Sequence, residues 1–143
     1  MKTLKLLGIL AIACVITFGL NSCSDEPSGG KPNVTLIEVG HDNSRHAHPG
    51  HDLHIEAEII AKGIINNVRV EIRQQGGNES IVKEFTSGQY IGVKNTTFHE
   101  HIDIPASTPL GKYTLSLSAT DKNGDRATAE CDITMEEGGA EPD

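Results

Sequence analysis

Apolar and polar residues alternate in short runs along most of the chain after residue 33, with turn-forming residues between the runs. A period of two is typical of strands that bury one face, and no stretch keeps helical spacing over three turns. In one run Leu53 and Ile55 share a face, while His54 and Glu56 share the other. Strands are predicted at residues 34–39, 52–61, 67–74, 80–85, 97–104, 112–120 and 127–135. The pattern therefore predicts an all-β fold, a seven-stranded antiparallel β-sandwich with one apolar face per strand.

The turns favour an immunoglobulin-like order of these strands. Residues 121–124 (Asp-Lys-Asn-Gly) suit a hairpin between the last two strands, because Asn-Gly readily adopts positive φ. Tyr113, near the start of the sixth strand, resembles the tyrosine corner of immunoglobulin-like domains. In that architecture the second and fifth strands are hydrogen-bonded neighbours. Cys131 has the inward parity of the seventh strand and is expected to be a buried, unpaired core residue.

The N-terminal segment has a different character. Lys2 and Lys5 precede an apolar stretch at residues 6–20, which is short for a transmembrane helix and ends in Leu-Asn-Ser-Cys at Cys23. This resembles the lipobox of bacterial lipoproteins, in which cleavage precedes the cysteine and its thiol carries lipid. A plain signal peptide or an uncleaved anchor is the alternative. The acidic residues after Cys23 resemble the surface-export signal of Bacteroidota lipoproteins, which implies an outer-membrane lipoprotein at the cell surface.

These observations predict four segments. They are a lipoprotein signal peptide at residues 1–22, a flexible tether at 23–32, the immunoglobulin-like β-sandwich at 33–136 and an acidic tail at 137–143. Lipid attachment is expected at Cys23, so that the outer membrane is a partner through the anchor.

Composition and charge narrow the classes of function. The formal net charge is −8, and a nucleic-acid partner is not expected because phosphate binding needs clustered Lys and Arg. Aromatic residues make up only 3% of the chain, which leaves few rings for stacking on sugars. No nucleophile motif or glycine-rich phosphate loop is present in the sequence, so we do not expect an enzyme.

Histidine is the most informative residue type in this chain. Five of the seven histidines lie between residues 41 and 54, and the other two are His99 and His101. Imidazole is the commonest metal ligand in proteins. By parity, His54, His99 and His101 point outward from the second and fifth strands, where loop histidines can join them. The predicted metal ligands are His46, His48, His51, His54, His99 and His101, with His41 the least well placed.

Two aspartates accompany this cluster. Asp52 and Asp103 are expected to serve either as ligands or as acceptors that orient an imidazole. Imidazole-rich ligation favours zinc, with copper or nickel as alternatives, over calcium or magnesium, which prefer oxygen ligands.

Three segments together resemble a known family. They are residues 50–59 (GHDLHIEAEI), 98–105 (FHEHIDIP) and 111–124, which opens on Gly-Lys-Tyr and closes on Asp-Lys-Asn-Gly. They are similar to an uncharacterised family of Bacteroidota lipoproteins, domain of unknown function 4625, over essentially the whole predicted domain. The resemblance implies an anchored β-sandwich and brings no activity.

Two functions remain open. The first is a surface-anchored lipoprotein domain that binds a divalent transition metal through its histidines, for capture, buffering or delivery, or that binds haem. The alternative is an immunoglobulin-like interaction module that docks a protein partner or a glycan without a metal. Titration with metal separates the two.

Overall fold

The structure, a computed structural model, describes residues 30–138. The predicted signal peptide, Cys23, most of the tether and most of the acidic tail lie outside these residues. The described part of the chain contains no helix long and apolar enough to span a membrane. Its elements are β1 (Asn33–Val39), η1 (His41–Asn43), β2 (His46–Ala47), β3 (Asp52–Ile60), β4 (Ile65–Gln74), β5 (Ser80–Phe85), β6 (Asn95–Asp103), β7 (Gly111–Asp121) and β8 (Arg126–Met135).

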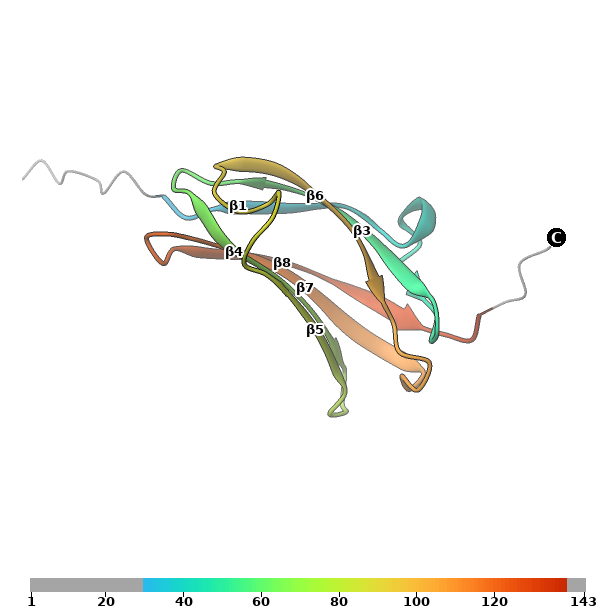
Figure 1. The fold of residues 1–143 in the computed structure, drawn as a ribbon. Helices are drawn as coiled ribbons and strands as arrows, with labels where there is room; N and C mark the ends of the chain where they lie inside the picture. The colour runs from blue at the N-terminus through green and yellow to red at the C-terminus, as the bar shows by residue number, and fades with distance from the viewer. Residues whose placement is uncertain (1–29, 139–143) are drawn as a thin grey trace, which may run out of the picture.

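The strands form two sheets that lie face to face (Figure 1). One sheet has the order β1-β3-β6, and the other has the order β2-β8-β7-β4-β5. The predicted pairing of the second and fifth long strands is confirmed, because β3 pairs with β6 in antiparallel register. The fold is therefore all-β, with a sheet of three strands over a sheet of five.

The prediction of seven strands is wrong, since the described residues hold eight. All seven predicted strands are present close to their predicted bounds, and the additional strand is β2. This strand pairs in parallel with the end of β8, where His46 is opposite Thr134 and Ala47 is opposite Met135. A strand of two residues is too short to show an alternating pattern, so the sequence did not predict β2. The pairing fixes the histidine-rich segment against the C-terminal end of β8.

One core lies between the two sheets. Ile55 and Phe98 enter it from the small sheet, and Ile72, Tyr113 and Leu115 enter it from the large one, all fully buried. Burying a side chain of this size contributes roughly 1.5–3 kcal/mol. The apolar residues that alternation places on the inner face of each strand are therefore the main source of stability. The Tyr113 hydroxyl donates a hydrogen bond to the carbonyl oxygen of Pro109 at 2.8 Å, which confirms the predicted tyrosine corner.

Cys131 faces the core side of β8 but is only partly buried. The expectation of a fully buried thiol is thus too strong. Burial nevertheless raises the pKa of the Cys131 thiol, and the nearby Arg45 guanidinium opposes that rise. The thiol is accordingly a poor nucleophile at neutral pH.

Candidate metal centre

The outer face of the small sheet brings histidines from two strands together. In the β3–β6 ladder His54 lies opposite His101, and Glu56 lies opposite His99. Residues directly opposite each other on antiparallel strands have Cβ atoms about 4.5–5.5 Å apart. Ile55 on β3 and Phe98 on β6 point into the core. The four residues named above alternate with them along the two strands and therefore point away from the core. The outward parity predicted for the three histidines is confirmed.

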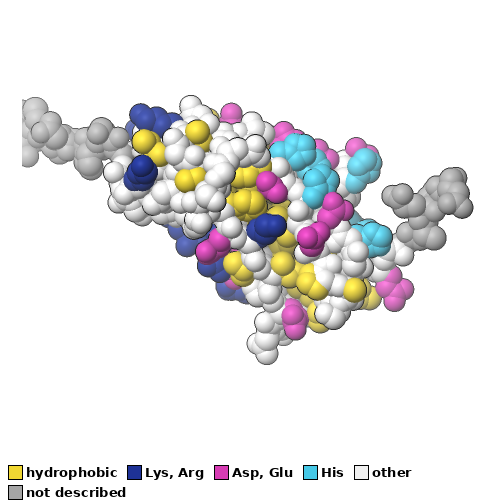
Figure 2. Space-filling model, in the orientation of Figure 1, with side chains coloured by type: hydrophobic (Ala, Val, Ile, Leu, Met, Phe, Trp, Pro, Cys, Tyr) yellow, Lys and Arg dark blue, Asp and Glu magenta, His cyan; other side chains and the backbone are white. Residues whose placement is uncertain are grey.

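Three imidazoles form a compact group on this face. One ring nitrogen from each of His54, His99 and His101 lies within 4.8 Å of the other two. The rings of His54 and His99 are stacked, with centroids 4.8 Å apart, and the His54 and His101 centroids are 5.1 Å apart. Figure 2 shows histidine side chains gathered at one end of the molecule with carboxylates beside them. Three imidazole nitrogens this close together form a candidate donor set for one divalent ion.

His54 has the least satisfied polar atom of the group. Its Nε2 is shielded from solvent and has no hydrogen-bond partner within the described residues. Buried polar atoms are nearly always paired, and leaving one unpaired costs about 1–3 kcal/mol. A cation bound at this nitrogen would supply the missing partner.

Asp52 holds the ring of His101. Its Oδ2 lies 2.7 Å from Nδ1 of His101. A carboxylate on one ring nitrogen fixes the orientation of the imidazole and leaves the other nitrogen, Nε2, available to a metal. Of the two roles considered for Asp52, this geometry favours the orienting one. Asp103 lies opposite Asp52 in the strand register.

Tyr90 holds the backbone of His99, and sequence reasoning missed it. Its hydroxyl lies 2.8 Å from the carbonyl oxygen of His99 and 2.8 Å from Oε1 of Glu100, and it accepts the N–H of His99 at 3.3 Å. Burial and the hydrogen bond to Glu100 raise the pKa of Tyr90, so the hydroxyl stays protonated. Tyr90 thus takes the place of a strand partner at the edge of β6. It lies in a connecting segment without a motif, which is why no sequence signal pointed to it.

A second group of donors overlaps the first. Oxygen atoms of Glu38 and Glu56 and a ring nitrogen of His54 also lie within 4.8 Å of one another. All three residues are half-buried. Glu56 was expected on an outward face, whereas Glu38 was not singled out from the sequence.

The remaining predicted ligands lie beside the three-histidine group. Nδ1 of His46 lies 2.5 Å from Oε1 of Glu136, and Nδ1 of His48 lies 3.1 Å from the Glu136 carbonyl oxygen. The rings of His48 and His51 meet edge to face, 6.2 Å apart. Between residues 30 and 138, none of these three belongs to a group of three donors within 4.8 Å.

These three histidines nevertheless line a hollow that also borders the three-histidine group. The hollow has a volume of about 370 Å³, and its lining includes His46, His48, His51, His54 and His101. His41 also lines it, but its exposed ring contacts Asp42 at 3.3 Å. The structure therefore places three histidines in one compact group and the other predicted ligands around the adjoining hollow.

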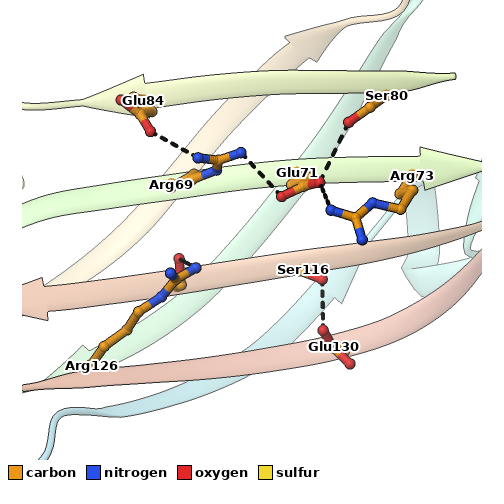
Figure 3. A network of polar contacts seen from close by, with 9 residues as sticks. Arg69, Glu71, Arg73, Ser80, Glu84, Ser116, Arg126 and Glu130 are labelled. Carbon is orange, nitrogen blue, oxygen red and sulfur yellow. Dashed lines mark hydrogen bonds and ion pairs between the residues drawn. The ribbon is translucent and has the colours of Figure 1, made fainter. Parts of the chain in front are cut away.

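The outer face of the large sheet has a different character (Figure 3). Arg69 contacts Glu71 at 3.1 Å and Glu84 at 3.2 Å, and Arg73 also contacts Glu71. The hydrogen bond from Arg73, together with the positive charges of Arg73 and Arg69, lowers the pKa of Glu71. Arginines and glutamates on this face neutralise one another, whereas the outer face of the small sheet holds acids and imidazoles, with Asp52 paired to His101.

Comparison with known proteins places the chain in a family. A family model described as "Domain of unknown function (DUF4625)" matches residues 21–136. The chain belongs to this family. The match covers all eight strands of the DUF4625 domain described above. No curated protein matches the chain.

Two solved structures are similar in fold. One is catalytically inactive OgpA from Akkermansia muciniphila in complex with an O-glycopeptide (glycodrosocin) substrate, with a TM-score of 0.54 and 15% identity over 73% of this chain and 29% of that chain. The other is Spo0M, a sporulation control protein from Bacillus subtilis, with a TM-score of 0.51 and 12% identity over 76% of this chain and 51% of that chain. The DUF4625 domain therefore spans about half or less of each, and the likeness concerns the fold alone.

Proposed function

We propose that this protein is a surface lipoprotein whose immunoglobulin-like sandwich binds one divalent transition metal at His54, His99 and His101. The observation that carries the proposal is the group of three imidazole nitrogens within 4.8 Å of one another, to which His54 contributes one. The Nε2 of His54 is also shielded from solvent and has no hydrogen-bond partner within the described residues. Zinc is the preferred ion, with copper or nickel as alternatives, because imidazole suits these borderline cations.

The arrangement suits capture and release of an ion better than a structural role. His99 and His101 are exposed, and the core of the sandwich is complete without the site. Three protein ligands leave a fourth position, which solvent or a ligand from a partner can take. The hollow lined by His46, His48 and His51 would offer weaker nitrogens beside that position.

The N-terminal sequence supports the proposed location. A basic start, a short apolar stretch and Cys23 fit lipid attachment, with an acidic segment after it that fits export to the cell surface. We infer a role in metal capture, buffering or delivery at the outer membrane. Catalysis is not part of the proposal, since the sequence supplies no nucleophile motif and the site needs only to hold an ion.

Calorimetric titration of the full chain, purified in detergent, with Zn²⁺ tests the proposal. We expect one ion per chain for the parent and at least about a tenfold loss of affinity in His99→Ala/His101→Ala, which removes two of three ligands. The matched control is His46→Ala/His48→Ala, which removes two of the other histidines that line the hollow and should change the affinity far less. Equal affinity of the parent and the His99→Ala/His101→Ala variant would show that the cross-strand site is wrong.

The alternative is an interaction module that docks a protein or a glycan without a metal. It takes over if the parent binds neither Zn²⁺ nor Cu²⁺ below roughly millimolar concentrations, a free energy of about −4 kcal/mol.

A further inference from the structure

We propose that Glu38, Glu56 and His54 form a second, carboxylate-rich cation position that shares His54 with the three-histidine position. The inference rests on the proposed metal-binding function and extends it to harder divalent ions such as Mn²⁺. The oxygen atoms of the two glutamates and a ring nitrogen of His54 lie within 4.8 Å of one another.

A β-bulge in β1 creates this position. The register of β1 and β3 runs from Leu36 opposite Ala57 directly to Glu38 opposite Glu56, so that Ile37 is the inserted residue. If these residues instead alternated regularly with no bulge, Leu36 and Glu38 would share a face and Glu38 would point toward the core. Bulges re-aim side chains in this way and are over-represented next to functional sites.

Within the part of the chain that the structure describes, the two carboxylates of this group have no ion-pair partner. Glu38 and Glu56 are half-buried and lie opposite each other on neighbouring strands. Among residues 30–138, the ion pairs involve other side chains and neither of these two. Like charges directly opposite each other destabilise a sheet. A divalent cation between the two carboxylates would turn this repulsion into attraction.

His54 makes the two positions exclusive. A neutral imidazole has one nitrogen with a free lone pair, because the other nitrogen carries a proton. His54 can therefore serve one cation at a time. Two carboxylates and one imidazole suit Mn²⁺, whereas three imidazoles suit Zn²⁺ or Cu²⁺. On this sheet face His54 thus binds Zn²⁺ or Cu²⁺ together with His99 and His101, or Mn²⁺ together with the two glutamates.

Titration of the full chain in detergent with Mn²⁺, followed by the electron paramagnetic resonance signal of the free ion, tests this inference. We expect the parent to bind one Mn²⁺ and added Zn²⁺ to release it. Glu38→Gln/Glu56→Gln should weaken Mn²⁺ binding by at least about tenfold and leave Zn²⁺ affinity within about threefold. His99→Ala/His101→Ala should do the opposite: it should weaken Zn²⁺ binding and leave Mn²⁺ binding close to that of the parent. Glu58→Gln is the matched control, since Glu58 is exposed on β3 and belongs to neither group.

The outcomes separate this inference from the function on which it rests. If the parent binds Zn²⁺ but not Mn²⁺, or if Glu38→Gln/Glu56→Gln binds Mn²⁺ as the parent does, the second position is wrong and the zinc site stands. If Mn²⁺ stays bound while Zn²⁺ binds, the two positions do not share His54 and the inference is overturned. A parent chain that binds neither ion overturns the proposed function and this inference together.

Discussion

A single hydroxyl group supports one of the three clustered histidines. Tyr90 contacts both the N–H and the carbonyl oxygen of His99, so that the backbone of this residue is held at an otherwise free edge of β6. Its ring also packs against Phe98, with centroids 4.9 Å apart, so the phenyl part of the side chain belongs to the core. The hydroxyl and the ring of Tyr90 therefore have separate roles.

Replacing Tyr90 by Phe tests the role of the hydroxyl. We expect Tyr90→Phe to lower the free energy of unfolding by about 1 kcal/mol, as for loss of one hydrogen bond, and also to weaken Zn²⁺ binding several-fold. Tyr113→Phe is the control, because its hydroxyl bonds to Pro109 instead. It should cost similar stability in urea unfolding and leave the calorimetric zinc affinity unchanged. Equal zinc affinities in both variants would mean that Tyr90 has only a structural role.

Cys131 gives a second expectation at the scale of one residue. Burial raises the pKa of its thiol, so the thiolate is scarcer at neutral pH than in an exposed cysteine. A disulfide reagent at pH 7.5 should therefore label Cys131 slowly in the folded chain and rapidly after denaturation. Mass spectrometry of the peptide that contains Cys131 follows the reaction. Fast labelling of the native chain would show that the core side of β8 is open to reagents.

Glu71 shows how charges act between strands of the large sheet. Contacts with Arg73 and Arg69 lower its pKa from the ordinary value of 4.5. A carboxyl group with a lowered pKa stabilises the fold above its ordinary pKa, and this contribution is lost as the pH falls through the lowered value. The ion pairs lie at the surface, so the contribution is below about 1 kcal/mol and is screened by salt.

The corresponding test is Glu71→Gln in urea unfolding. At pH 7 and low salt we expect the free energy of unfolding of the variant to be lower than that of the parent by less than about 1 kcal/mol. The difference should shrink in about 1 M salt, where the screening length falls to about 3 Å, and also as the pH falls below the ordinary carboxyl pKa. Glu79→Gln, in an exposed turn outside these ion pairs, is the control. A difference that is insensitive to both salt and acid would contradict an electrostatic origin.

Elements with regular alternation were predictable, and elements with an interruption were not. His54 and His101 could be assigned to one face because β3 and β6 pair from Asp52 to Ile60 without a break in register. Glu38 could not, because parity counted from Leu36 turns it inward until the inserted Ile37 is taken into account. The position of Tyr90 depends on the path of a connecting segment, and the contacts that fix this path are tertiary.

The path of the histidine-rich segment was beyond sequence reasoning for a related reason. Three non-glycine residues, Asp42, Asn43 and Arg45, have positive φ and turn the chain sharply before β2. Such conformations are uncommon outside glycine and depend on surrounding contacts, here the pairing of β2 with β8. The sequence therefore predicted that loop histidines lie near the corner of the small sheet but not which of them join the ligand group.

At the scale of the whole molecule, metal binding should couple to folding. The ligands come from β3 and β6, which are far apart in the sequence, so the unfolded chain cannot preassemble them. Zn²⁺ should therefore raise the melting temperature, with a gain in stability of about 2.7 kcal/mol when the free ion is at 100 times its dissociation constant. Protons compete with metal for imidazole nitrogens, whose ordinary pKa is near 6.5, so the gain should fade between about pH 7 and pH 5.

Calorimetric melting with and without Zn²⁺ at several pH values measures this coupling. The zinc-dependent increase in melting temperature should be clearly smaller in the His99→Ala/His101→Ala variant than in the parent. A zinc-dependent increase that persists at pH 5, or that is equal in the variant, would place the ion elsewhere on the chain.

The division of each strand into an inner and an outer set of side chains also bears on how such a domain can evolve. Ile55 and Ile102 belong to the core, whereas His54 and His101 alternate with them and face outward. Exposed substitutions away from special features usually change stability by less than about 0.5 kcal/mol. Donor residues on this face can therefore be gained, exchanged or lost one at a time while every intermediate still folds. A lineage of such chains could change its ion without changing its architecture.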